Sequence, residues 1–517
     1  MKLFKFGSVL LFVLCSFSLL GQKNKEVQEV DYLAQPNRIE FEEKFEDGDY
    51  HIVPADEMGL VILKETSERS SGGFYWEYHY VDTLLQEKWV KKYVLHSSVR
   101  YRGFDYSAGY VNLLYAESNK RDVRKFTLLR LNLANGDSTQ FTLETIFPLS
   151  LTEFEVLGDV AIIGGYANYR PVIFLYDFKR RRMKVLPGFY NNKSELLDIE
   201  IDDERLRFNV LMAEFTPVNR QTISIKTFNK LGEMIQNRLL EPEDKKSLIY
   251  GQSTRLNYGV QYISGTYAAR KSDYSRGVYI AKIDRGQQEY LKYYAFPDLE
   301  NFFSYLPSRR QERVENRIKR RRVSGKKVRL SYRLLVHDIV KLHDNYIMIG
   351  EAYYHKHLST NYAMPVGRYF GRHHKNHSAP YDQLIVGYKY THAVVIAFDE
   401  NGNVTWDNSF EITDVLSLEL KQFVHVAGKE DEVILLYMFE GEIRSKLIVG
   451  DDISEGKTMS AIKLKYDDDE VISDRKEEGG LAKWIGNSFY AYGIQRIKRQ
   501  NNNQRREVFY INKIVYK

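Results

Sequence analysis

The chain has 517 residues, of which 43% are hydrophobic and 14% aromatic, and its formal net charge is +6. This hydrophobic content excludes an intrinsically disordered chain, and the length is sufficient to bury a sizeable core. Tyrosine occurs 39 times and proline only 11 times, a composition typical of half-buried β-strands.

The first 21 residues have the pattern of a secretory signal peptide. Lys2 and Lys5 precede an apolar run that ends at Leu20, and Gly21 provides a small residue at the expected cleavage position. The run is too short for a good transmembrane helix. We therefore predict an exported protein, periplasmic or associated with the cell surface, whose mature chain has no transmembrane segment. Export also argues against a nucleic-acid partner.

The only cysteine, Cys15, lies inside the predicted signal peptide. Its neighbour Leu14 stands where a lipoprotein signal needs a small residue, which argues against a lipid anchor. The predicted mature chain then has no thiol for a disulfide, a nucleophile or a metal site. Residues 22–37 are expected to be a linker, and residues 38–517 must be stabilised by their own core.

Short strands recur along residues 38–517. A tight turn, an alternating apolar strand, a glycine and usually an aromatic residue occur at 160–166, 260–267, 346–353 and 488–493. Other strands are joined by Asn-Gly turns, as at Asn401-Gly402, which are a strong hairpin signal because these residues tolerate positive φ. Two hairpins make a four-stranded module of about 50 residues, within the range of propeller repeats.

Eight candidate modules begin near Tyr50, Ser98, Ile146, Lys193, Lys246, Tyr332, Val415 and Glu478. This repetition predicts an all-β fold, a β-propeller of seven or eight four-stranded blades. Stacked β-sandwiches are the alternative. The last module supplies only about three strands, so we expect an N-terminal strand at 38–45 to complete it and close the ring.

One hairpin turn carries the motif D-x-N-G-x-x-x-W, formed by Asp399, Asn401, Gly402 and Trp406. Over 335–413 the chain resembles quinoprotein-type propellers and uncharacterised secreted propeller-like proteins of Bacteroidota. The resemblance implies a propeller architecture and an exported location. The threonine that the quinoprotein turn has before its glycine is absent, and only one module carries the tryptophan. No quinone or other cofactor is therefore predicted.

Positive charge is concentrated in a predicted insertion at 298–331. Residues 309–329 contain eleven Lys and Arg against two acids, a local charge of +9 in a chain whose total is +6. Residues 309–322 are predicted to form a helix that ends at Gly325. Such a segment attracts anionic polymers. The alternative is a solvated segment, or one paired with acids such as Asp467–Glu470.

Three aromatic residues before this run, Phe302, Phe303 and Tyr305, are predicted to anchor it on the propeller. The candidate ligand-binding residues are Arg309, Arg310, Arg313, Arg317, Lys319, Arg320, Arg321 and Arg322, together with Tyr353, Tyr354 and Tyr369 of a second insertion.

This second insertion is a His/Tyr-rich loop predicted at 353–392. Its histidines are His355, His357, His373, His374 and His377. A His-x-His pair on a strand places both imidazoles on one face, and a His-x-x-x-His pair chelates when helical. A divalent metal site is therefore one interpretation, and a loop that recognises a ligand without metal is the other.

No nucleophile elbow, zinc-protease motif or phosphate-binding loop occurs in the sequence. The leading interpretation is a non-catalytic binding or scaffold protein of the bacterial envelope. Its two insertions, expected on one face, would recognise a protein partner or an anionic glycan. The alternative is a glycan-active hydrolase or lyase, because carboxylate pairs are assembled in space rather than in sequence. That enzyme would show inward-facing acids with perturbed pKa values at the propeller channel.

Overall fold

A computed structural model provides the structure of the chain. It describes residues 32–44, 48–117, 120–190, 193–216, 218, 220–243, 245–254, 257–269, 272, 274–357, 385–429, 432–449, 452–475, 479–501 and 503–517. The predicted signal peptide at 1–21 therefore lies outside the described residues. Within the described part, no helical segment has both the length and the hydropathy of a membrane span.

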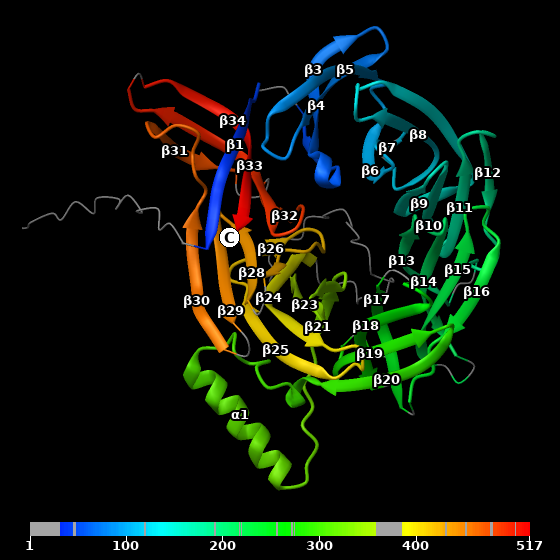
Figure 1. Cartoon of the computed structure of the whole chain (residues 1–517), viewed down its shortest axis with the longest axis vertical. Coiled ribbons are helices and arrows are strands. Elements are labelled where there is room, and N and C mark those ends of the chain that lie inside the picture. The colour runs from blue at the N-terminus through cyan, green and yellow to red at the C-terminus, as the bar shows by residue number, and fades with distance from the viewer. Residues whose placement is uncertain are drawn as a thin grey trace, which may run out of the picture.

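The described strands form seven antiparallel sheets, arranged around a common centre (Figure 1). The first sheet contains β2 (Tyr50–Pro54), β3 (Leu60–Ser70), β4 (Gly73–Val81) and β5 (Glu87–Leu95), with the short helix η1 (Asp56–Met58) after β2. The second contains β6 (Arg100–Ser107), β7 (Tyr110–Ala116), β8 (Asp122–Asn132), β9 (Ser138–Leu157), β10 (Val160–Ala167), β11 (Arg170–Asp177) and β12 (Arg182–Val185). The third contains β13 (Glu195–Asp202), β14 (Arg207–Phe215), β15 (Gln221–Asn229) and β16 (Met234–Leu239).

The fourth sheet contains β17 (Lys246–Ser253), β18 (Val260–Ala269), β19 (Gly277–Asp284) and β20 (Gln287–Ala295). After it come η2 (Phe296–Asp298) and α1 (Ser308–Val323). The fifth sheet contains β21 (Arg333–Val336), β22 (Val340–Leu342), β23 (Asn345–His357), β24 (Ile385–Phe398), β25 (Val404–Glu411) and β26 (Leu416–Ser417). The sixth contains β27 (His425–Lys429), β28 (Glu432–Phe439), β29 (Glu442–Val449) and β30 (Asp452–Ala461). The last contains β31 (Asp469–Asp474), β32 (Gly480–Lys483), β33 (Ser488–Arg499), β34 (Arg505–Tyr516) and β1 (Leu33–Glu42).

The wide second sheet consists of two four-stranded layers that share β9. This strand pairs with β8 through its first half and with β10 through its second half. The two layers pack on each other, because Phe126 and Leu128 of one layer lie in the same apolar cluster as Phe154 and Phe174 of the other. The described residues form seven hydrogen-bonded sheets, or eight units when the two layers of the second sheet are counted separately, and the number of blades stays a prediction.

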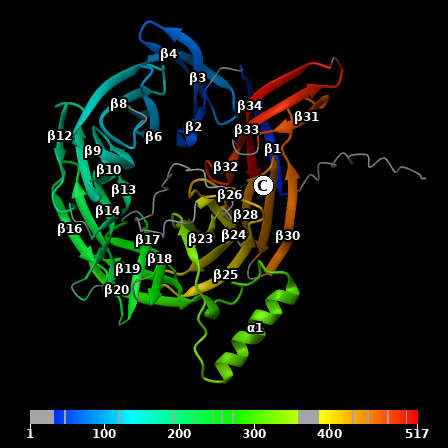
Figure 2. The same ribbon diagram turned by 180° about the vertical axis from the view of Figure 1, so that it is seen from behind.

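Consecutive sheets pack face to face around the ring, and the first and last sheets also meet. Leu60 and Ile62 of the first sheet share an apolar cluster with Trp484 and Ile511 of the last. The first strands of neighbouring layers adjoin, since β6 contacts β9, β9 contacts β13, β13 contacts β17 and β17 contacts β21. Both views show the sheets as a ring (Figures 1 and 2). This all-β arrangement is a β-propeller, and stacked sandwiches are not observed in the described residues.

A strand from the N-terminus lies in the sheet of the C-terminal residues, where β1 pairs antiparallel with β34. It begins at Leu33, within the segment predicted to be a linker, and ends before the predicted limit of residue 45. Pro36, which cannot donate a ladder hydrogen bond, lies where the register shifts between Ala34 and Asn37. The last module also contains β31, a strand that the sequence did not reveal.

The D-x-N-G-x-x-x-W motif forms the β24–β25 turn. Asp399 Oδ1 accepts hydrogen bonds from the backbone N–H groups of Asn401 and Asn403, at 2.9 and 2.7 Å. Gly402 has φ +73°, and an added Cβ would lie 2.4 Å from the ring of Tyr290 on the neighbouring sheet. The motif therefore has a structural explanation, because only glycine fits this turn without strain.

Candidate functional site

The segment before α1 is anchored on the fifth sheet by aromatic side chains. Phe302 is fully buried, and its ring centroid lies 4.8 Å from that of Phe296 and 5.2 Å from that of Tyr332. Tyr305 stacks on His392 of β24, with ring centroids 3.7 Å apart and planes 2° from parallel. Burial lowers the pKa of His392 to about 3, so its imidazole is neutral under ordinary conditions.

Hydrogen bonds fix the same segment. The two carboxylate oxygens of Asp407 accept the backbone N–H groups of Glu300 and Asn301, both at 2.8 Å. The Oγ of Ser409 accepts the N–H of Tyr305 at 2.9 Å. The prediction that the aromatic residues before the basic run anchor it on the propeller is therefore confirmed.

The basic run forms α1, as predicted, and a glycine in the left-handed conformation lies just after the end of the helix. Gly325 has φ +67°, and its N–H group donates to the carbonyl of Arg322. Ile318 is the only buried residue of the helix, and it joins the anchor's apolar cluster together with the half-buried Val314. The spacing of these two residues is one helical turn, so a narrow apolar stripe attaches α1 and leaves its cations in solvent.

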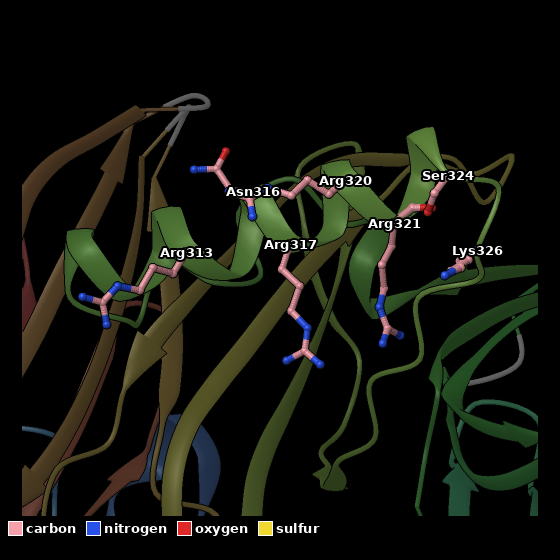
Figure 3. A pocket seen from close by; sticks show the side chains of 7 residues that line it. All are labelled: Arg313, Asn316, Arg317, Arg320, Arg321, Ser324 and Lys326. Atoms are coloured by element: carbon pink, nitrogen blue, oxygen red, sulfur yellow. The ribbon is translucent and has the colours of Figure 1, made fainter.

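A hollow of about 410 Å³ lies beside α1. Figure 3 shows Arg317 and Arg321 extending from the helix toward the same side, with Lys326 on the segment that follows it. The seven lining residues are Arg313, Asn316, Arg317, Arg320, Arg321, Ser324 and Lys326. Five of the seven are cationic and none is acidic. We call this surface the cationic groove.

The groove cations make no ion pair with any acid in the described part of the chain. The helix contributes one such pair elsewhere, in which Arg322 lies 2.7 Å from Asp298 and donates to the carbonyl of Pro297 at 2.6 Å. The predicted alternative, in which the basic run pairs with Asp467–Glu470, is wrong for Asp469, which pairs with Arg499 and Arg506. The groove therefore presents uncompensated positive charge.

Not every predicted cation belongs to the groove. Arg309, Arg310 and Lys319 are exposed on the helix but do not line the hollow, and Arg322 is held by Asp298. Conversely, Asn316, Ser324 and Lys326 line it and were not predicted.

The second insertion leaves the propeller at the edge where α1 returns to it. Arg333, the first residue of β21, pairs with Tyr353 near the end of β23. Tyr354 is exposed, and the ring of His355 lies edge-on to Tyr388, with centroids 5.3 Å apart. We call this side of the molecule the insertion face.

Much of the predicted His/Tyr loop lies outside the described residues. Its two ends, 353–357 and 385–392, belong to β23 and β24 and are not loop, a difference explained by the continuous ladder between these strands. The register of this ladder shifts between Lys356 and His357. The remaining candidates, Tyr369, His373, His374 and His377, lie outside the described residues. Among the described residues, no three His, Cys, Asp or Glu side chains are grouped so that they could hold a metal ion, and the metal site stays a prediction.

A second cluster, which the sequence did not reveal, lies on the innermost strands. Asp105 of β6, Glu155 of β9, and Asp198 and Glu200 of β13 are all half-buried. Asp105 and Glu155 are hydrogen-bonded to each other, carboxyl to carboxyl. Glu200 accepts hydrogen bonds from Ser253 Oγ at 2.6 Å and Gln261 Nε2 at 3.3 Å. We call these four residues the inner acid cluster.

The electrostatics of this cluster favour protonated carboxyl groups. Burial raises the pKa of Glu155, and the neighbouring charge of Asp105 raises it further. Burial also raises the pKa of Asp105, to a smaller extent, and raises that of Glu200 to about 8 with a contribution from Asp198. At neutral pH the cluster therefore holds protons that exposed carboxyl groups would have lost. One sequence signal was present: on a strand in which four of eight residues are acidic, the Asp-x-Glu spacing places residues 198 and 200 on one face.

Comparisons with known proteins add little to this description. No protein-family model and no curated protein sequence matches the chain. Similar solved structures include the β-propeller domain of the Trilobed protease from Pyrococcus furiosus, at 9% identity and a TM-score of 0.35, with 80% of this chain and 94% of that chain covered. The Dos1 propeller is similar at 8% identity and a TM-score of 0.36, with coverage of 77% and 74%. A prolyl endopeptidase is similar at 9% identity and a TM-score of 0.36, over 88% of this chain but only 54% of that one. TM-scores this low support no inference about this chain, and the assignment of a β-propeller is based on the strand pairing described above.

Proposed function

We propose that the protein is an exported, non-catalytic binding protein of the bacterial envelope that recognises an anionic glycan through the cationic groove. The observation that carries this proposal is the set of five cations around one hollow, without an acid among its lining residues. Charges that serve only solubility need no common hollow and no rigid support, whereas α1 is held on the sheet by buried aromatic residues and by Asp407.

The spacing along the helix supports a linear ligand. Arg313, Arg317 and Arg321 follow one another at intervals of four residues, which places them along one side of α1 at a rise of roughly 6 Å each. A chain of sugar acids presents repeated carboxylates to such a row. An arginine pairs with a carboxylate through two parallel hydrogen bonds, so the match is geometric as well as electrostatic.

Titration of the mature protein with polygalacturonate, a linear acidic polysaccharide, tests the proposal. The triple variant Arg313→Gln, Arg317→Gln, Arg321→Gln should bind roughly 3- to 150-fold more weakly at low salt, since it removes three exposed pairs that contribute roughly 0.2–1 kcal/mol each. The matched control is Arg309→Gln, Lys319→Gln, Lys327→Gln, which removes the same charge outside the groove and should change affinity much less. A neutral glucan serves as the ligand control.

Equal losses in the two triple variants would mean that only net charge matters and would contradict a specific groove. Absence of polygalacturonate binding by the unaltered protein would remove the glycan proposal altogether. Export is tested separately, by the N-terminal sequence of the protein recovered from the producing cell, which should begin near Gln22.

A second candidate function, a glycan-active hydrolase or lyase, is favoured by the inner acid cluster. A carboxyl group kept protonated beside a carboxylate is the arrangement that proton donation to a leaving group requires. In this function Glu155 would be the proton donor and Asp105 its partner. Their direct hydrogen bond leaves no room for a sugar between them, so a further acid such as Asp198 would have to act on the other side of the substrate.

Release of reducing ends from acidic polysaccharides measures this activity. A cleaving protein should lose activity at least a hundredfold in Glu155→Gln and keep it in Glu233→Gln, an exposed acid on the outer part of the third sheet. Binding without any new reducing ends would leave the protein a binding protein.

A further inference from the structure

Aromatic side chains with exposed rings lie close together at the second sheet. Phe147 and Tyr190 are 40% and 47% exposed, and their rings stack with centroids 6.4 Å apart and planes 20° from parallel. The guanidinium carbon of Arg170 lies 4.8 Å from the Tyr190 centroid. Ile146 is also exposed beside Phe147 in the chain. These residues come from three separate segments, in the middle of β9, at the start of β11 and after β12.

The adjoining turn holds a tyrosine in a conformation that favours glycine. Asn168 and Tyr169 join β10 to β11 as a two-residue turn, with φ of +49° and +63°. Glycine is the usual second residue of such a turn, and a tyrosine there is strained. Tyr169 is 81% exposed, so no packing compensates for the strain. Its ring is therefore accessible to another molecule.

This aromatic patch lies on the insertion face. Tyr166, near the end of β10, pairs with Ser150 at the start of the second half of β9, and its hydroxyl contacts Leu196 at the start of β13. The α1 segment joins β20, the last strand of one layer, to β21, the first strand of the next layer. Since the layers repeat around one axis, connections of this kind share one side of the ring. β11, β12 and α1 nevertheless lie on different parts of the ring (Figure 1).

We propose that Phe147, Tyr169, Arg170 and Tyr190 form a second subsite, which stacks on the sugar rings of the same acidic polysaccharide. This proposal rests on the function proposed for the cationic groove. Flat aromatic rings pack on the apolar C–H face of a pyranose, and their hydroxyl groups reach its polar edge. Arg170 beside the ring of Tyr190 fits a sugar that carries a carboxylate. A polymer long enough to reach both sites would gain affinity from each without new contacts at either.

The test compares two polyanions that differ in having sugar rings, polygalacturonate and inorganic polyphosphate, each titrated into the mature protein. Tyr190→Ala should weaken polygalacturonate binding roughly five- to tenfold and polyphosphate binding less than twofold. The matched control is Tyr258→Ala, because Tyr258 is 86% exposed, lies at a left-handed turn and carries Arg205 at 5.2 Å, but belongs to the β17–β18 turn on the opposite face. That variant should bind both polymers as the unaltered protein does.

A further variant separates binding from folding. Tyr169→Gly should weaken polygalacturonate binding while raising the midpoint of denaturant unfolding, since it relieves strain. A purely structural tyrosine would give the opposite shift.

Unchanged polygalacturonate affinity in Tyr190→Ala would overturn the subsite. The groove proposal would remain intact if the groove triple variant still lost binding to both polymers. Equal loss of both polymers in Tyr190→Ala would also overturn it, since stacking on sugars cannot affect polyphosphate. Failure of the unaltered protein to bind either polymer would overturn both proposals.

Discussion

The cationic groove and the inner acid cluster are opposite solutions to carrying like charges close together. The groove places Arg313, Arg317 and Arg321 on an exposed helix, where water screens their repulsion and the apolar stripe at Ile318 provides the attachment. The inner cluster places Asp105, Glu155 and Glu200 among packed strands. Retained protons and hydrogen bonds there reduce both the repulsion between the carboxyl groups and the cost of burying their charge. The retained protons make the charge of the inner cluster depend on pH.

We therefore expect substitutions at buried positions to change the free energy of unfolding more than substitutions in the exposed groove. The largest effect is expected at the anchor, where Phe302→Ala removes a fully buried ring from contact with Phe296 and Tyr332. We expect the free energy of unfolding to fall by about 3–5 kcal/mol, as for other buried aromatic truncations. Urea unfolding followed by circular dichroism measures it. A loss below about 1 kcal/mol would mean that the insertion is attached mainly by the Asp407 hydrogen bonds.

Acid should weaken the same anchor through His392. Its pKa is lowered by burial to about 3 in the folded chain, against an ordinary value of 6.5, so the unfolded chain takes up the proton first as pH falls. Stability is then complete above pH 6.5 and decreases as pH falls toward 3. Between pH 6.5 and 5 we expect a loss of roughly 2 kcal/mol that His392→Phe largely abolishes while keeping the stack on Tyr305. An unchanged pH profile in this variant would place the acid sensitivity elsewhere.

The inner cluster should respond in the opposite direction. Folding raises the pKa of Glu200 from 4.5 to about 8, so the folded chain retains a proton that the unfolded chain has lost. Stability is complete below pH 4.5 and falls as pH rises through 8. Glu200→Gln keeps a polar partner for Ser253 and should raise the unfolding free energy by about 1–2 kcal/mol at pH 8, with little change at pH 4.5. Equal effects at both pH values would indicate lost packing rather than a retained proton.

The smallest effect on stability is expected at the groove itself. The Arg313, Arg317, Arg321 triple change to Gln should alter the unfolding free energy by less than about 0.5 kcal/mol, since these side chains are exposed and have no ion pair among the described residues. A slight gain is consistent with relief of repulsion between neighbours four residues apart. A loss above about 1 kcal/mol would show that the arginines support the helix.

The two regions also differ in how far the sequence predicts them. The groove cations are neighbours along a single helix, so the charge of residues 309–329 and the end at Gly325 could be recognised directly. The hairpin turns and the repeat likewise depend on local residues, and they correctly indicated a propeller. The inner acids are contributed singly or in pairs by strands about 45 residues apart, and only the ring brings Asp105 to Glu155. The extra strand β31 was missed because it and β32 pair successively along the same strand, β33, a choice that depends on register.

The salt dependence of polygalacturonate binding tests the central claim, that the groove is an anion-binding site, most directly. The affinity of the unaltered protein should fall steeply as salt rises, because binding releases counterions in proportion to the number of cations engaged. The groove triple variant should show a clearly shallower dependence on salt and a lower affinity at the lowest salt, whereas the Arg309, Lys319, Lys327 triple variant should retain the slope of the unaltered protein. Identical slopes for all three proteins would contradict the account, because the ligand would then not engage the groove.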